Sequence, residues 1–396
     1  MKRLFNVIIL SLFFVLLFNS MVIASIDIEE EVRAYLLGDY ETGEILEGYN
    51  IYNPIEIASI SKLMTYILVM EHVQNGYISL DDKIYIDEDV TKIKGGSLEL
   101  EEGEVFTVLE LLKASLVVSA NDATYALAKY VAETEEGFVK LMNDKAEELG
   151  LDSAFYVNST GLPKEEYQNK MSTEDIFKLS IYILDRYPEV LSLTTIPYIE
   201  LEHRDYKKEN TNPLLNEIKG VDGLKTGSTI KAGYCLASTI NIEGDSIETD
   251  DFRLISIVMG TKSEEKRKEL SKKLVQYGIN NYSKKILANK NISLGTLYMP
   301  KSKNKEIEIF PSKNYSIILK NGDYIDKDIL IDEDIKLPLK PMDKVGKMVL
   351  SNEGNILEEI DLLIHEEVKK ENIFIRILKY IKDFIVNIFL LGYIQV

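Results

Sequence analysis

The chain of 396 residues contains a single cysteine and only three histidines. Cys235 therefore has no partner for an internal disulfide bond, and its small and apolar neighbours predict a buried core thiol. No histidine or cysteine cluster has the spacing of a metal site, and no glycine-rich loop precedes a helix as a phosphate-binding loop would. We therefore expect neither a metal nor a nucleotide cofactor.

Basic residues are also fewer than acidic ones. The chain has 46 Lys and Arg against 65 Asp and Glu, a net charge of -19. Electrostatic binding of nucleic acid or of an anionic bilayer requires Lys and Arg clustered on one face, and the body of the chain has no such cluster. The composition thus argues against nucleic acid as a partner.

The N-terminus has the features of an export signal. Lys2 and Arg3 precede an apolar run over residues 4–18, and Val22-Ile23-Ala24 offers a cleavage site after Ala24. An uncleaved membrane anchor is the alternative, but the polar stretch that begins at Ser25 follows the site at once. We predict a signal peptide over residues 1–24 and a mature protein at the outer face of the cytoplasmic membrane.

Within the C-terminal segment, residues 370–396, the part from Ile373 onward is almost wholly apolar except for one narrow stripe with Arg376, Lys379, Asp383 and Asn387. This pattern predicts an amphipathic helix that lies in a membrane surface. A spanning helix is disfavoured because the uninterrupted apolar part, residues 384–391, is far shorter than the roughly 20 residues that a span needs. The alternative is a helix packed on the preceding domain.

Between these ends the periodicity changes twice. Strand patterns over 32–49, helical patterns over 107–184, strands over 221–259 and a helix over 264–282 predict an α+β catalytic unit, 25–283, whose sheet is covered by helices with an inserted helical region. Residues 77–103 are polar and predict an exposed loop beside a cleft. Short alternating stretches separated by turns predict a small β-rich domain over 284–369.

The candidate nucleophile is Ser59. An apolar pattern of helical spacing begins just after it, so we expect a helix from about Ser59, whose N-terminal N–H groups would favour developing negative charge. Lys62 projects from the same face one turn later and could act as the base. Ser-x-x-Lys also occurs at Ser228, Ser263 and Ser302, so the motif alone fits a helix cap with a solvated lysine equally well.

Two further motifs are weak alone and strong in this order. Ser119-Ala120-Asn121 stands between two predicted helices, where a hydroxyl and a carboxamide can face a cleft. Lys225-Thr226-Gly227 ends a predicted strand, where the glycine permits a close approach of substrate backbone and the Lys and Thr donors suit a carboxylate. A serine acyl-transfer site needs these three elements together.

The combination Ser-x-x-Lys, Ser-x-Asn and Lys-Thr-Gly resembles the penicillin-recognising serine enzymes. The flanks, including Asn158-Ser159-Thr160-Gly161-Leu162 and the stretch from Val221 to Cys235, look like those of the low-molecular-mass D-alanyl-D-alanine carboxypeptidases. The resemblance covers residues 30–283 closely. It extends loosely through the β-rich domain and the terminal amphipathic helix.

This resemblance implies a role for each motif residue. Ser59 would attack the bond between the two D-alanines of a peptidoglycan stem peptide, with Lys62 as base and Ser119 as a proton relay. Asn121 would orient the substrate amide and the Lys62 amine. Lys225, Thr226 and Gly227 would bind the substrate through its carboxylate and backbone. The N–H groups of Ser59 and Ser228 would form the oxyanion hole. β-Lactams would acylate the same serine.

One departure and three competing functions accompany the resemblance. Many relatives have an arginine where this chain has Thr211, and Arg204 could compensate for it near the substrate carboxylate. A β-lactamase would need a Glu-x-x-Leu-Asn arrangement, which is absent around Val157–Leu162. An endopeptidase that cuts cross-links is the second competing function, and an inactive peptidoglycan-binding scaffold is the third.

Overall fold

The computed structural model describes residues 26–201, 203–374, 377–378, 381–382 and 384–386. They form two compact units. The first contains the described residues up to Gly38, together with Gly43–Ile240 and Ile255–Tyr277. The second contains Asp39–Thr42, Asn241–Leu254 and the described residues from Gly278 onward. The predicted export signal lies outside the described residues.

A five-stranded sheet with the order β2-β1-β12-β10-β9 forms the centre of the first unit. Its strands are β1 (Ala34–Asp39), β2 (Ile45–Tyr49), β9 (Val221–Thr229), β10 (Gly233–Ile242) and β12 (Phe252–Thr261). β1 is buried along its whole length, as expected for a strand covered on both faces. β9 is the edge strand and pairs antiparallel with β10, Ser228 opposite Tyr234. The Lys-Thr-Gly motif, predicted to end a strand, therefore lies inside one that continues two residues beyond Gly227.

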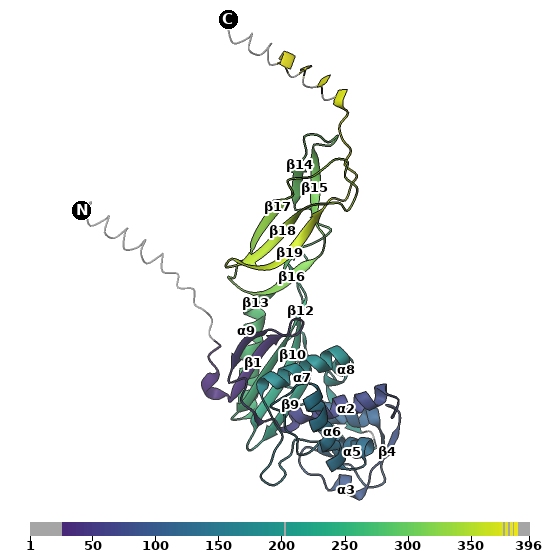
Figure 1. The fold of residues 1–396 in the computed structure, drawn as a ribbon. Helices are drawn as coiled ribbons and strands as arrows, with labels where there is room; N and C mark the ends of the chain where they lie inside the picture. Colours follow the sequence, from purple (N-terminus) through teal and green to yellow (C-terminus); the bar gives the residue numbers. More distant parts are fainter. Residues whose placement is uncertain (1–25, 202, 375–376, 379–380, 383, 387–396) are drawn as a thin grey trace, which may run out of the picture. The chain divides into compact units, whose positions relative to one another are not determined.

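Helix α2 (Lys62–Gln74) is the buried helix of this unit, and its first nine residues are all inaccessible to solvent. A helix that is apolar on all sides requires neighbours on all sides. α2 packs against α4, α5, α6 and α7, and Figure 1 labels α5, α6 and α7 near it. The bounds are α4 (Val108–Val117), α5 (Asn121–Ala132), α6 (Glu135–Glu148), α7 (Thr173–Arg186), α8 (Val190–Thr194) and α9 (Glu264–Asn281).

The helix ends follow their capping residues. Thr107 caps α4 through a reciprocal capping box with Glu110, and Ser172 caps α7 by accepting from Asp175 N. The exposed loop predicted over 77–103 contains two short elements, since β4 (Lys83–Tyr85) pairs with β5 (Val105–Thr107) and Asp87 caps α3 (Glu88–Thr91). The other short elements are η1 (Glu29–Glu31), β3 (Ile55–Glu56), η2 (Ala58–Ser61), β6 (Lys170–Met171), β7 (Tyr198–Leu201) and β8 (Tyr206–Glu209).

The second unit is built from strands. A five-stranded sheet has the order β14-β15-β19-β18-β17, and a three-stranded sheet has the order β11-β13-β16. Residues that alternate along these strands, such as Ile307 and Ile309, fill one apolar core with Met348, Leu350 and Ile360. The strands are β11 (Thr249–Asp250), β13 (Tyr282–Ala288), β14 (Gly295–Tyr298), β15 (Glu306–Pro311), β16 (Tyr315–Lys320), β17 (Asp326–Ile331), β18 (Lys344–Asn352) and β19 (Asn355–Leu363).

Within the predicted terminal helix, the described residues between 373 and 386 are helical. Their apolar side chains are exposed, with Phe374 73% and Phe384 62% accessible. Among the helices that the structure describes, none is both long and apolar enough to cross a membrane. The remaining residues of this segment lie outside the described part of the chain.

Candidate active site

Ser59 lies in a tight turn at the start of the buried helix. The α-helix predicted to begin at Ser59 begins instead at Lys62, because residues 58–61 form the 3₁₀ turn η2. Ala58 has a φ of 47°, a left-handed conformation that is unusual for a residue with a Cβ, and Ser61 Oγ donates to its carbonyl at 2.7 Å. This turn places Ser59 on the wall of a cleft while its neighbours Ala58 and Ile60 are buried.

The amine of Lys62 is fully buried and has three oxygen neighbours. Its Nζ lies 2.9 Å from Ser59 Oγ, 2.7 Å from Asn121 Oδ1 and 2.8 Å from the carbonyl oxygen of Thr160. The carboxamide and carbonyl oxygens can only accept, whereas the serine hydroxyl can also donate. A neutral amine satisfies all three at once, since two N–H groups serve the two acceptors and the lone pair receives the Ser59 proton.

The electrostatics of the site favour that neutral form. Burial lowers the pKa of Lys62 to about 7, and the charge of Asp122 opposes the shift only in part. Lys225 is also buried, and the pKa of this second amine is held well below its ordinary value by burial and by the positive charge of Lys62. The positive charge of Lys62 thus disfavours protonation of Lys225, whereas burial accounts for the lowered pKa of Lys62 itself.

The Ser-x-Asn motif forms the opposite wall of the cleft. Asn121 is the first residue of α5, and its carboxamide is held at both ends, by Lys62 and by the carbonyl of Lys94, to which Nδ2 donates at 2.9 Å. Its backbone N–H donates to Gly96 O at 2.7 Å. Ser119 has a φ of 60° and lines the cleft beside Ser59. The motif therefore brings a fixed amide and a hydroxyl into the cleft.

β9 forms the wall next to the nucleophile. A Cβ on Gly227 would lie 2.8 Å from the carbonyl oxygen of Ile57 and 3.0 Å from the nitrogen of Ser59, so only glycine permits this approach. Thr226 and Ser228 line the cleft, and Thr226 Oγ1 donates to Thr211 Oγ1 at 2.7 Å. The amine of Lys225, by contrast, belongs to a side chain that is 1% exposed, and it donates to the carbonyl of Thr226 at 3.0 Å, beneath the strand.

Arg267 and Lys208 add positive charge to the cleft, which has a volume of about 260 Å³. Arg267 extends from α9, is 3% exposed and pairs with Glu264 at 2.7 Å. Glu264 is the only carboxylate among the described residues that line the cleft. Arg267 was not predicted from the sequence, because it lies 40 positions after Gly227 in a helix whose pattern marks it as an ordinary surface cation.

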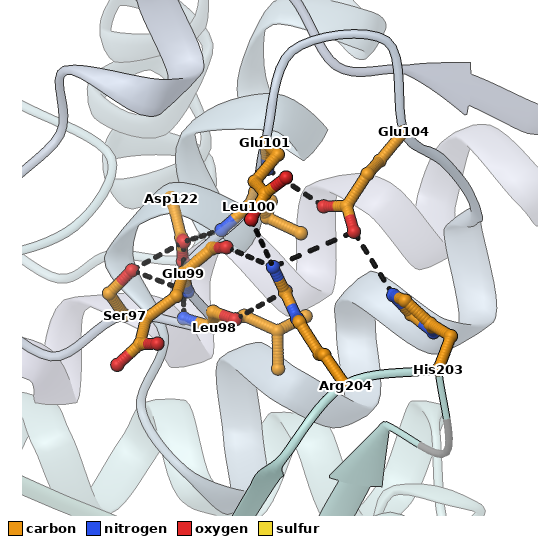
Figure 2. A network of polar contacts seen from close by, with 9 residues as sticks. All are labelled: Ser97, Leu98, Glu99, Leu100, Glu101, Glu104, Asp122, His203 and Arg204. Carbon is orange, nitrogen blue, oxygen red and sulfur yellow. Dashed lines mark hydrogen bonds and ion pairs between the residues drawn. The ribbon is translucent and has the colours of Figure 1, made fainter.

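Figure 2 shows how the loop that carries Gly95 and Gly96 is fastened. The carboxylate of Asp122 accepts from the backbone N–H groups of Leu98 and Leu100 and from Ser97 Oγ. From the other side, Arg204 donates to the carbonyl oxygens of Leu98 and Glu99.

Arg204 and His203 both belong to this network through Glu104. Arg204 lies 3.6 Å from Glu104 in an ion pair, and it does not line the cleft. The suggestion that Arg204 replaces a missing cleft arginine was therefore wrong, since its donors are committed to this loop. His203 is an exposed partner of Glu104.

The fold and this constellation can now be compared with known proteins. A family profile described as D-alanyl-D-alanine carboxypeptidase matches residues 21–263. The chain belongs to this family. The profile of the penicillin-binding protein 5 C-terminal domain matches residues 282–370, which contain the β-rich sheets of the second unit. The predicted fold class and enzyme class, a serine-type carboxypeptidase with a β-rich domain after it, are confirmed.

Individual relatives cover between 63% and 89% of this carboxypeptidase. It is 31% identical to the D-alanyl-D-alanine carboxypeptidase DacF of Bacillus subtilis over 365 residues, 89% of this chain and 90% of the relative. Penicillin-binding protein D2 of Listeria monocytogenes, solved in its ampicillin-bound form, is 35% identical and superposes with a TM-score of 0.56. The matched region is 63% of this chain and 97% of the D2 chain. PBP3 of Streptococcus pneumoniae superposes with a TM-score of 0.66 at 25% identity, over 85% of this chain and 99% of its own.

Proposed function

We propose that this protein removes the terminal D-alanine from peptidoglycan stem peptides through an acyl-enzyme on Ser59, and that β-lactams acylate the same serine. The observation that carries the proposal is the Lys62 amine, which is buried, has a pKa lowered to about 7 and lies 2.9 Å from the Ser59 hydroxyl. A serine beside a base of matched pKa is an activated nucleophile.

The reaction then follows from the residues around the cleft. Lys62 takes the Ser59 proton as Oγ attacks the scissile carbonyl, whose oxygen is received by the N–H groups of Ser59 and Ser228. Ser119 relays the proton to the leaving amine, which departs as free D-alanine. Water then cleaves the ester and regenerates Ser59.

Exopeptidase specificity requires groups that bind the free carboxylate of the substrate. Thr226 contributes a hydroxyl, while Arg267 and Lys208 contribute positive charge at the same cleft. Lys225 acts from beneath the strand, where its buried amine donates to the carbonyl of Thr226 and so supports the wall that bears the Thr226 hydroxyl. Asn121 holds the Lys62 amine and presents its carboxamide to the substrate amide.

Two experiments on the intact protein test this function. Fluorescent penicillin should form a covalent label that survives denaturation and maps to the Ser59 peptide, and a pentapeptide ending in D-Ala-D-Ala should release D-alanine. A protein that takes no label is an inactive scaffold. Rapid loss of the label indicates a β-lactamase, and cleavage of cross-linked dimers with no release of D-alanine indicates an endopeptidase.

We also propose that residues 1–24 are an export signal, that 25–283 and 284–369 are the catalytic and β-rich domains, and that 370–396 anchor the protein to the outer face of the cytoplasmic membrane. The exposed apolar side chains of the described helical residues support the anchor. Deletion of 373–396 should move the protein from the membrane fraction to the soluble fraction while penicillin labelling is retained. Truncated protein that still sediments with membranes would refute the anchor.

A further inference from the structure

A second hollow, with a volume of about 600 Å³, adjoins the catalytic cleft. It is formed where β9 and β12 end and β10 begins, together with Arg33 just before β1. Ser228 and Tyr234 line both the hollow and the cleft. The hollow and the cleft are therefore neighbours that share two wall residues.

The hollow is positively charged in a protein whose net charge is -19. Arg33, Lys231 and Lys262 line it, and no Asp or Glu does among the described residues. Lys231 donates to the backbone carbonyl of Glu166 at 3.0 Å, and neither Lys231 nor Lys262 has a carboxylate partner within 4.0 Å in the described part of the chain.

Arg33, unlike the two lysines, has a carboxylate partner. It pairs with the half-buried Glu56 at 2.9 Å and donates to the carbonyl of Lys231 at 2.8 Å. It thereby fixes the β9–β10 turn, and the two lysines remain as the cations available to a ligand.

The direction of β9 indicates which part of a substrate would reach the hollow. Under the proposed function, the free carboxylate lies near Thr226, Lys208 and Arg267, and the scissile carbonyl lies between Ser59 and Ser228. The acyl side of the substrate then extends the opposite way, past Ser228 toward the turn at Ile230, which is fully exposed. This end of the strand leads into the hollow.

We infer that Lys231 and Lys262, on a turn held by Arg33, form a subsite for a carboxylate carried by the stem peptide upstream of the scissile bond. The inference rests on the proposed function, because that function sets the direction of the bound peptide. The ligand chemistry is that of an acidic peptide: an ionised carboxylate accepts charge-assisted hydrogen bonds from lysine. Substrates that carry such a carboxylate would be bound in preference to their amidated forms.

The test compares two synthetic peptides that both end in D-Ala-D-Ala, one with a free carboxylate on an upstream side chain and one with the corresponding amide. For the unmodified protein, we expect kcat/KM to be about tenfold higher for the carboxylate peptide, mainly through a lower KM. In the double variant Lys231→Ala/Lys262→Ala this preference should disappear, while the amidated peptide is cleaved as before. Lys92→Ala, which removes an exposed lysine that follows α3, should keep the preference.

Penicillin labelling separates the subsite from the function on which it rests. A penicillin has only a short acyl side chain in place of the upstream peptide, so the double variant should be labelled at the unmodified rate. Normal labelling with equal kcat/KM for the two peptides in the unmodified protein would overturn the subsite alone. A preference that survives the double substitution would also overturn it, and absence of labelling in the unmodified protein would overturn the proposed function.

Discussion

Replacing Lys62 by methionine should slow the acylation of Ser59 by penicillin by roughly 10³-fold, within the range that a general base contributes. Methionine is a comparable unbranched side chain that fills the buried site but offers no basic nitrogen to the Ser59 proton. The rate of label formation under single-turnover conditions measures the effect. Lys92→Met, at the exposed end of α3, is the matched control and should acylate at the unmodified rate.

The pH profile gives the same prediction a second readout. Because burial lowers the pKa of Lys62 to about 7, the neutral base accumulates as pH rises, and the acylation rate should climb through pH 7 to a plateau. The remaining rate in Lys62→Met should lack this rise. An unmodified protein whose rate rises only near the ordinary lysine pKa of 10.5 would contradict the assignment of Lys62 as the base.

Stability provides a control for misfolding of Lys62→Met. An unfolded chain keeps the Lys62 proton up to about pH 10.5, whereas the folded chain loses it near pH 7, the lowered pKa of the buried amine. Between these values the unfolded chain binds more protons, so this lysine penalises folding at neutral pH and the penalty shrinks as pH rises toward 10.5. Replacing the amine by a thioether removes the penalty. This gain opposes the loss of the hydrogen bonds that Asn121 Oδ1 and the Thr160 carbonyl accept from the amine, so Lys62→Met should melt close to the unmodified protein at pH 7.

Gly161→Ala should destabilise the protein by more than about 4 kcal/mol and abolish penicillin labelling, which places it among the largest effects of a single substitution. Gly161 has a φ of 85°, and an added Cβ would lie 1.9 Å from the carbonyl oxygen of Ala58 and 2.9 Å from the nitrogen of Ser59. The clash is with the backbone of the nucleophile turn, which cannot move without displacing Ser59. It would also shift Thr160, whose carbonyl holds the Lys62 amine.

Gly150→Ala is the matched control. Gly150 also has a positive φ, 66°, but nothing lies within 4 Å of an added Cβ. This variant carries only the conformational cost of a left-handed alanine, about 1–2 kcal/mol, and should be labelled normally. Chemical denaturation of both variants measures the difference. Equal stability and equal labelling would show that the close approach of Gly161 to the nucleophile turn does not matter.

The parts of this structure that could be predicted from the sequence are those with local causes. Thr107 and Glu110 mark the start of α4 because a capping box is a contact between neighbours in sequence. The spacing of Ser59 and Lys62 places them on one face because a turn of helix relates them. The three motifs also indicated a single site, and the structure brings Ser59, Lys62 and Asn121 within hydrogen-bonding distance.

What could not be predicted depends on contacts between distant segments. The carbonyl of Thr160 holds Lys62 from 98 positions away, and the order of residues along the chain does not reveal which backbone oxygen will point at an amine. Arg267 reaches the cleft only because α9 and β9 meet in three dimensions. Arg204 is close in sequence to the region where an arginine was expected. It holds a loop instead, because the fold brings it to the carbonyl of Leu98.

Asn121 and Asp122 are consecutive residues in the first turn of α5, and each has its own structural role. The first fixes the catalytic amine and the second fastens the loop that bears Gly95 and Gly96. A single rigid helix end thus sets the spacing between the base and one wall of the cleft, so that wall has little freedom to adapt to a different stem peptide. Divergence in substrate preference among proteins of this design should therefore accumulate on the opposite side, along β9 and the turn that follows it.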